Sequence, residues 1–197
     1  MLRFGITGRS GTGKSTVARL FERYGVRHVD ADKVAHNIYA PGTPCAAELV
    51  EHFGTGILDE NGAIDRKILG PIVFADPKEL AALSSITHRY VGEAIDEIER
   101  QAEADGVRGL LVDAIALLES GQARGPVVVV TAPYEVQLAR IIERDGLTEE
   151  AARRRLDAQR EEDFFASKAD YVIVNHGSLE DLEAQVEQVA RALGLCP

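Results

Sequence analysis

Short apolar runs alternate along the chain with longer segments in which apolar residues recur at helical spacing. The runs that predict strands lie at residues 3–7, 26–30, 109–113, 126–131 and 171–174. Consecutive apolar positions, like the valines at 127–130, are typical of strands in a parallel sheet that is buried on both faces. Because strands alternate with helices, we predict a three-layer α/β fold.

Several helix boundaries can be assigned from the sequence. Residues 15–24 carry an apolar stripe, and Gly25 can end that helix in the left-handed conformation. The last helix begins at Ser178, where Asp181 three positions later completes a capping-box pattern. A further helix is expected over residues 133–145.

One segment of roughly eighty residues, between the second and third expected strands, is longer than a single crossover needs. Glycine and proline punctuate its first half, and residues 77–104 read as helical. We interpret 40–105 as a mostly helical substrate-binding insert. The core of a single domain would then comprise residues 1–39, 106–139 and 166–197.

The segment between the first strand and the first helix carries the strongest chemical signal. It reads Gly8-Arg9-Ser10-Gly11-Thr12-Gly13-Lys14-Ser15 and matches G-x-x-x-x-G-K-[ST] in full. Glycines at positive φ let backbone N–H groups approach phosphate oxygens, and the helix N-terminus adds partial positive charge. We therefore predict that a nucleoside triphosphate, ATP, binds here, with contacts from Gly8, Ser10, Gly11, Thr12, Gly13, Lys14, Ser15 and Thr16.

Three side chains of this loop have expected chemical roles. Lys14 can reach the β- and γ-phosphates, the Ser15 hydroxyl can ligate Mg²⁺, and Thr16 can add a phosphate contact. The alternative is a flexible glycine-rich turn, but the strand–loop–helix context favours phosphate binding. The dinucleotide fingerprint G-x-G-x-x-G does not occur, since Ser10 occupies its second glycine position, which argues against hydride transfer.

Carboxylates follow two of the expected strands. Asp30 and Asp32 lie at the carboxyl end of the second strand, where open α/β sheets bind ligands. Asp32 can orient an acceptor hydroxyl and take its proton, with Asp30 as the substitute, or it can cap a helix beginning near residue 33. Asp113 ends the third strand and can hold Mg²⁺ or line the acceptor site. Glu119 is expected in the same ligand crevice as Asp113. Asp32 is a further candidate ligand for the metal.

A basic segment follows at residues 140–165. Arg140 and Arg144 are four positions apart on one helix and share a face. We interpret the segment as a lid whose arginines close over ATP and exclude water. The alternative is a solvated pair of charged helices, whose surface ion pairs contribute only about 0–1 kcal/mol each.

Composition narrows the classes of partner. The formal net charge of −10 argues against a duplex nucleic-acid binder, but it leaves room for an anionic small molecule held by a local basic cluster. Cys45 and Cys196 match no metal-ligand spacing and are expected to be free thiols. No apolar run approaches the roughly 20 residues of a membrane span, and we expect a cytoplasmic monomer or weak homo-oligomer.

Together these segments resemble the dephospho-CoA kinase family over nearly the whole chain. The matching segments, beyond the loop from Gly8 to Thr16, are Val29-Asp30-Ala31-Asp32, Ala40-Pro41-Gly42, Phe74-Ala75-Asp76-Pro77, Ile86-Thr87-His88, Leu117-Leu118-Glu119-Ser120-Gly121, Arg144-Asp145-Gly146-Leu147-Thr148, Ala158-Gln159, Ala169-Asp170-Tyr171-Val172-Ile173 and Asn175-His176-Gly177-Ser178. The phosphate loop alone is shared by many NTPases, whereas this ordered series is far more selective.

The resemblance implies a P-loop NTPase fold with a five-stranded parallel sheet, a helical insert that binds coenzyme A, and a lid. It implies ATP-dependent phosphorylation of the ribose 3′-hydroxyl of dephospho-CoA, the last step of coenzyme A synthesis. Asp32 would be the base, and Lys14 and Arg140 would steady the transferring phosphoryl group. The further site residues that the resemblance implies are His88 and Glu119 on the substrate side and Asn175 and Gly177 near the adenine of ATP.

The chain departs from the family pattern at three positions. The family often has proline at two positions where this chain has Arg89 and Ile115. Phe165 replaces an arginine frequently seen six residues after the Ala-Gln pair. These departures concern the substrate pocket and the lid, and they leave the phosphate loop and Asp32 intact.

Other function classes share parts of the pattern. Another small-molecule kinase of the nucleotide- or shikimate-kinase type would keep the loop and the lid without this insert. A GTPase switch is suggested by two fragments, Asp59-Glu60-Asn61-Gly62 and Ser167-Lys168-Ala169-Asp170, although the second has serine where the guanine-reading motif needs asparagine or threonine. A nucleotide-binding pseudo-enzyme is disfavoured because Lys14, Ser15 and Asp32 are intact.

Overall fold

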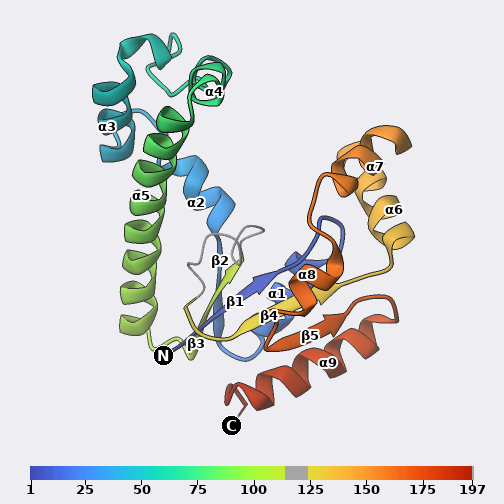
Figure 1. Cartoon of the computed structure of the whole chain (residues 1–197). Helices are drawn as coiled ribbons and strands as arrows, with labels where there is room; N and C mark the ends of the chain where they lie inside the picture. Colours follow the sequence, from blue (N-terminus) through green and yellow to red (C-terminus); the bar gives the residue numbers. More distant parts are fainter. Residues whose placement is uncertain (114–123, 197) are drawn as a thin grey trace. The chain divides into compact units, whose positions relative to one another are not determined.

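The computed structural model describes residues 1–113 and 124–196 and forms two compact units (Figure 1). The first unit comprises Met1–Val29 and Ala102–Pro197, and the second comprises Asp30–Gln101. Asp32 therefore belongs to the second unit, whereas the sequence analysis assigned it to the core segment 1–39.

The expected parallel sheet is confirmed, with strand order β2-β3-β1-β4-β5. Its strands are Leu2–Thr7 (β1), Val26–Asp30 (β2), Gly109–Asp113 (β3), Val127–Thr131 (β4) and Tyr171–Val174 (β5). β1 is central, and its register sets Phe4 beside Leu111 on β3 and Ile6 beside Val128 on β4. The phosphate loop therefore leaves the middle of the sheet, where both neighbouring strands support it.

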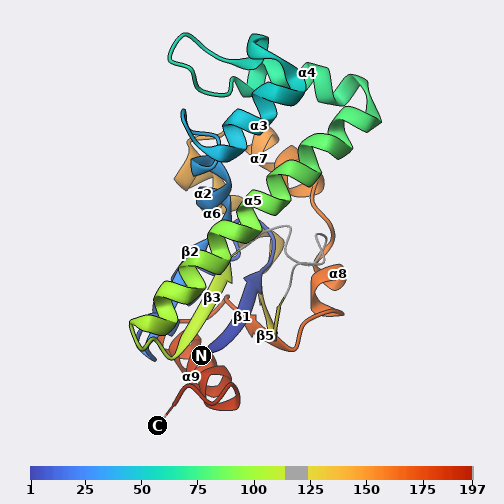
Figure 2. The same ribbon diagram turned by 90° about the vertical axis from the view of Figure 1, so that its left-hand side faces the viewer.

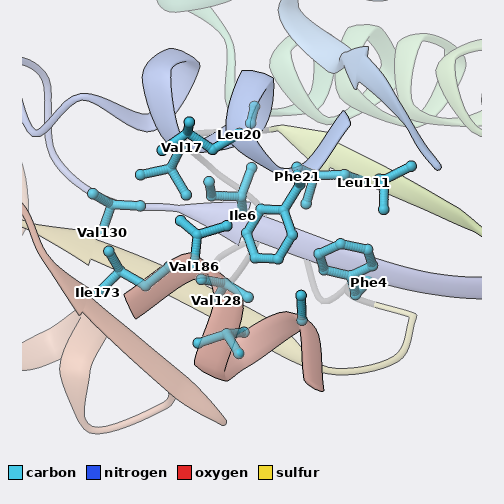
Figure 3. Packing of buried hydrophobic residues seen from close by; sticks show 14 of the residues in the cluster. Phe4, Ile6, Val17, Leu20, Phe21, Leu111, Val128, Val130, Ile173 and Val186 are labelled. Carbon is cyan, nitrogen blue, oxygen red and sulfur yellow. The ribbon is translucent and has the colours of Figure 1, made fainter. Parts of the chain in front are cut away.

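One face of the sheet is covered by Lys14–Glu22 (α1) and Leu179–Ala192 (α9), which contact each other. Figure 3 shows the core that results, in which Phe4 and Phe21 meet edge to face with ring centroids 5.3 Å apart. The expected capping box is present, and Gly25 is left-handed as expected, although α1 ends earlier, with its C-cap at Arg23. Gly25 follows α1 at φ 75°, and Ser178 and Asp181 form both bonds of the capping box that starts α9.

The other face of the sheet is covered at β4 by a short helix, Glu162–Ala166 (α8). Its Phe165 is buried against Val127 and Val129. An arginine at this position would place its charge in the apolar layer under the sheet, at a large desolvation cost. Phe165 therefore contributes to the core, which explains this departure from the family pattern.

Two helices between β4 and α8 form a hairpin, Tyr134–Asp145 (α6) and Glu149–Asp157 (α7). Gly146 ends α6 in the left-handed conformation, and the Thr148 hydroxyl caps α7 by accepting a hydrogen bond from the Ala151 amide. The hairpin has its own small core, made of Leu138, Ile141, Ala152 and Leu156.

The second unit is helical, as expected for the insert. It contains Ala31–Asn37 (α2), Pro44–Phe53 (α3), Thr55–Ile57 (η1), Arg66–Ala75 (α4) and most of Pro77–Ala104 (α5). Figures 1 and 2 both show α3 and α4 beside the N-terminal part of α5. Polar contacts tie α3 to α5, since Tyr90 donates a hydrogen bond to Glu48 at 2.8 Å and His52 lies 2.8 Å from Glu79.

None of the helices within the described ranges combines the length and the apolar character that crossing a bilayer demands.

The two cysteines should differ in reactivity. Both are free thiols, but Cys45, in the first turn of α3, is buried, and burial raises its pKa to about 11. Since the thiolate is the reactive form, native Cys45 should resist a thiol reagent at pH 8, whereas the less buried Cys196 reacts. Timed labelling with peptide mass analysis measures both rates.

Cys196→Ser is the control, and it should abolish the fast labelling while leaving the slow phase. In urea both cysteines should label at similar rates. Fast labelling of Cys45 in the native protein would contradict the packing of the second unit described here.

Candidate functional site

The loop from Gly8 to Gly13 joins β1 to α1 and passes close to other backbone and side-chain atoms. Gly13 precedes α1 at φ 92°, and a Cβ there would overlap the Asn175 amide. Gly11 lies at φ 79°, and a Cβ there would overlap the Gln137 carbonyl. Positive φ and close approach therefore require both glycines, although the motif specifies only Gly13 of the two.

The carbonyls at the start of the loop are satisfied from within the loop. Lys14 Nζ donates hydrogen bonds to the carbonyls of Gly8 at 2.9 Å and Arg9 at 3.2 Å. The Thr12 hydroxyl also donates to the Arg9 carbonyl, at 2.9 Å. The Lys14 ammonium is thus held over the loop next to the N-terminus of α1, where a phosphate would be attracted.

The later carbonyls of the loop are satisfied by residues far away in the sequence. Arg140, on α6, donates to the carbonyls of Gly11 at 3.2 Å and Thr12 at 3.3 Å. Asn175, directly after β5, donates to the Thr12 carbonyl at 2.7 Å and is 8% exposed. The structure therefore brings two of the expected ATP-site residues together at the loop.

These two residues also contact each other. Arg140 Nη2 lies 3.4 Å from Asn175 Oδ1. The backbone N–H of Asn175 donates to the Thr131 carbonyl at the end of β4. The end of the sheet thus fixes Asn175, and Asn175 helps to orient the guanidinium of Arg140.

The connection after α7 supplies contacts that the sequence analysis did not assign. Gln159 accepts a hydrogen bond from the Ser10 amide at 3.0 Å and donates one to the Ser10 hydroxyl, also at 3.0 Å. Arg9 donates to the Leu156 carbonyl at 2.6 Å. The Ala-Gln pair was part of the family pattern, but no sequence rule indicated what its glutamine touches.

The oxygen ligands expected for Mg²⁺ are few. Ser15, in the first turn of α1, is exposed, and Asp113 ends β3 beside Ile6 of β1. Within the described ranges, no group of three or more His, Cys, Asp or Glu side chains could hold a metal ion. A hydroxyl and a carboxylate fit Mg²⁺, which usually takes one or two protein ligands and completes its shell with water and substrate phosphates.

Asp113 has a neighbour that the sequence analysis did not consider. His28 Nε2, on β2, lies 3.7 Å from Asp113 Oδ2, and both side chains are mostly buried. A protonated His28 would attract the carboxylate at this distance, although the separation is too long for a direct hydrogen bond.

Arg144 is engaged on the hairpin. Its guanidinium makes two hydrogen bonds to the adjacent Asp145, at 2.7 and 2.8 Å, and Arg155 also binds Asp145 at 2.7 Å. The bond from Arg144 lowers the pKa of the Asp145 carboxyl and raises the pKa of the Arg144 guanidinium. Arg144 thus forms the kind of ion pair that the alternative to a lid predicts, whereas Arg140 donates hydrogen bonds to the phosphate loop.

In the second unit, the cap of α2 is Asp30. Its carboxylate accepts the Lys33 amide at 3.0 Å, and the helix begins at Ala31. The alternative that made Asp32 the cap is therefore wrong, because the helix starts two residues earlier than expected. Asp32 is exposed in the first turn and lines a cavity of about 340 Å³ with Asp30, Lys33, His36 and Asn37.

A second cavity of the same unit, about 650 Å³, lies between α3 and α5. It is lined by Pro44, Ala47, Glu48, Glu51, His52, Ile86 and Tyr90. His88 is exposed. It is two residues away from both Ile86 and Tyr90, so it lies on a different face of α5 from the one that lines this cavity. Arg89 pairs with Glu48, and the hydrogen bonds from Tyr90 and Arg89 lower the pKa of the Glu48 carboxyl.

The remaining expected residues are placed as follows. Gly177 is exposed between Asn175 and α9, and a Cβ there would crowd the Asp181 carboxylate that caps the helix. Glycine is therefore favoured at position 177 for a structural reason, whether or not it also contacts a nucleotide. Glu119 and Ile115 lie outside the described residues.

The chain is similar to known proteins over nearly its whole length. The family model described as dephospho-CoA kinase matches residues 2–181. A dephospho-CoA kinase from Corynebacterium glutamicum is 42% identical over 191 residues, which cover 96% of this chain and 98% of that protein.

Solved structures give the same result. A dephospho-CoA kinase from Campylobacter jejuni is 30% identical with a TM-score of 0.59, covering 97% of this chain and 96% of that chain. A shikimate kinase from Bacteroides thetaiotaomicron, 14% identical with a TM-score of 0.55 over 98% of both chains, shares the fold alone. On the family match and the level of identity, the chain belongs to the dephospho-CoA kinase family.

Proposed function

We propose that this protein transfers the γ-phosphoryl group of ATP to the ribose 3′-hydroxyl of dephospho-CoA, giving coenzyme A and ADP. The observation that carries the proposal is the phosphate loop, whose carbonyls are bound by Lys14, Arg140 and Asn175 in a member of this family. With its carbonyls bound on one side, the loop can turn its N–H groups toward a triphosphate. Free thiols and the use of ATP are consistent with a reaction in the cytoplasm.

In the proposed reaction, a bond forms between the 3′-oxygen and the γ-phosphorus, and the bond to the β–γ bridging oxygen breaks. Asp32 accepts the hydroxyl proton, and ADP leaves. Lys14 and Arg140 stabilise the charge on the phosphoryl oxygens, which is the main way in which proteins catalyse this transfer. Asn175 and Gly177 lie on the adenine side of ATP.

Mg²⁺ bound with ATP would neutralise phosphate charge and orient the leaving group. Ser15 would hold it, with Asp113 as a further ligand directly or through water, and their oxygens suit this ion. On the acceptor side, the residues proposed to contact dephospho-CoA are His88 and Glu119.

The support for Asp32 as the base comes from its position in the chain. It follows β2 by two residues, and the carboxyl ends of parallel strands lie at one edge of a sheet. Asp32 is exposed to solvent, where an acceptor hydroxyl can reach it. Asp30 caps α2, and its carboxylate lies 3.4 Å from the Lys33 amine.

The two sequence fragments that suggested a GTPase, at residues 59–62 and 167–170, both make structural hydrogen bonds. Asp170 accepts the Val127 amide at 2.8 Å and so helps to join the starts of β4 and β5. Asp59 accepts the amides of Asn61 and Ala63 in a turn. Each carboxylate therefore has a structural role that explains its place in the sequence.

The proposal is tested by incubating the purified chain with ATP, Mg²⁺ and dephospho-CoA and detecting coenzyme A by mass. Lys14→Ala should lower kcat by about 10² or more, because it removes a charge aimed at the transition state. Shikimate and nucleoside monophosphates serve as competing acceptors. Faster phosphorylation of one of them would overturn the acceptor assignment, and near-normal turnover of Lys14→Ala would contradict the role of the loop.

Asp32→Asn should separate proton transfer from nucleotide binding. The amide keeps the size of the side chain but cannot accept the proton, so kcat should fall by about 10² or more while ATP affinity stays within about two-fold. Calorimetry with a non-hydrolysable ATP analogue measures the affinity. Asp30→Asn is the matched control: asparagine can still cap α2, and kcat should stay within about two-fold of wild type. A collapse of ATP affinity in Asp32→Asn would instead assign Asp32 to the nucleotide site.

Arg140→Ala should raise the share of ATP that is lost to water. The variant removes the donors to the Gly11 and Thr12 carbonyls and a charge beside the phosphates, so water would compete better with the acceptor. The measured quantity is ADP formed per coenzyme A formed, with Arg144→Ala as control because Arg144 is engaged with Asp145. An unchanged ratio in Arg140→Ala would count against the lid.

A further inference from the structure

The α6–α7 hairpin is attached to the phosphate loop at two separate places. From α6, Arg140 donates to the carbonyls of Gly11 and Thr12. From the end of α7, Gln159 binds both the amide and the hydroxyl of Ser10. Attachment at one point would leave the loop free to rotate against the hairpin, whereas attachment at two points fixes its orientation.

The attachment at the end of α7 is reinforced by Arg9. Its guanidinium donates to the Leu156 carbonyl, one of the last carbonyls of α7, and lies 5.9 Å from the centre of the Tyr134 ring. A cation is favoured at a helix C-terminus, where carbonyls lack partners within the helix. Leu156 itself is fully buried in the hairpin core, so this anchor is rigid.

The anchored segment also contacts the lysine that the proposed reaction uses. Lys14 Nζ and the Thr12 hydroxyl both donate to the carbonyl of Arg9, one residue before Ser10. A shift of the Arg9–Ser10 segment would therefore move an acceptor that helps to hold the Lys14 amine. Gln159 contacts the same segment at Ser10, which is buried.

We propose that Gln159 is a positioning residue for phosphoryl transfer, which holds the Arg9–Ser10 arm of the phosphate loop and so keeps Lys14 and Arg140 in register with the triphosphate. The inference deepens the proposed function and rests on it for the identity of the reaction. The Ser10 amide is bound by Gln159, so it is not among the loop N–H groups left for the phosphates.

The kinetic signature follows from the location of these bonds. They lie within the first unit, on the nucleotide loop, so losing them should affect ATP and the transfer step and spare the binding of dephospho-CoA. A merely structural glutamine would lower thermal stability and leave the kinetics of the folded enzyme unchanged. The KM for each substrate and the melting temperature therefore separate the two roles.

The test compares the full-length chain with Gln159→Leu, which removes both bonds at similar side-chain volume and leaves the buried Ser10 amide without this partner. We expect kcat/KM for ATP to fall by about ten-fold or more, with the KM for dephospho-CoA within about two-fold of wild type. Affinity for a non-hydrolysable ATP analogue, measured by calorimetry, should fall in parallel.

Ser10→Ala supplies the second measurement, because it removes only the acceptor of the Gln159 amide. Alone it should lower kcat/KM for ATP less than Gln159→Leu does, and in the Gln159→Leu background it should add almost nothing. If Gln159→Leu does not fold, the effect of Ser10→Ala on ATP but not on dephospho-CoA still decides the matter. Multiplying effects in the double variant would show that Gln159 acts elsewhere.

The matched control is Gln185→Leu. Gln185, on α9, binds the backbone N–H and C=O of Val174 at 2.9 and 3.0 Å, which is the same kind of two-bond amide contact on the edge strand. It should lower the melting temperature and leave kcat/KM for ATP within about two-fold of wild type.

Equal kinetics and equal analogue affinity for Gln159→Leu and wild type would overturn the positioning role. A wild-type enzyme that binds the analogue but forms no coenzyme A would instead refute the proposed function. In that case the effect of Gln159→Leu on analogue affinity still tests the loop contact.

Discussion

A phosphate loop must find hydrogen-bond donors for its own carbonyls, and the rest of this site is arranged around that constraint. The glycine-rich backbone between β1 and α1 can present N–H groups to phosphate only if its C=O groups find donors elsewhere. In this protein the donors are Lys14, the Thr12 hydroxyl, Arg140 and Asn175. An unpaired buried carbonyl would cost about 1–3 kcal/mol, so each donor also stabilises the loop.

The constraint explains why the site is assembled from distant parts of the chain. The donors come from the loop itself, from α6 and from the residue after β5, and Gln159 joins from the end of α7. The same contacts place the positive charges of Lys14 and Arg140 along the loop, although the chain as a whole carries a formal charge of −10. The local field that a triphosphate would meet is thus set by these few groups rather than by composition.

Two of the departures from the family pattern have physical causes in the described packing. Phe165 fills the apolar layer under β4, and Arg89 binds Glu48 across the α3–α5 contact. Asp170, which had suggested guanine recognition, accepts the Val127 amide. Each of these residues serves the fold, and residue type alone could not show this.

The sequence alone determined the strands, the helix over residues 77–104, the capping box at Ser178, and the phosphate loop, because strand pattern, capping and loop geometry depend on neighbours within a few positions. The tertiary structure decided which side chains meet that loop. Asn175 and Arg140 were expected near ATP, but their hydrogen bonds to the Thr12 carbonyl, and those between Gln159 and Ser10, became visible only in the fold. The cap at Asp30 instead of Asp32 depends on a helix start only two residues earlier than expected, which is within the uncertainty of a boundary read from sequence. The loop contacts join residues more than a hundred positions apart, and local periodicity does not encode such pairs.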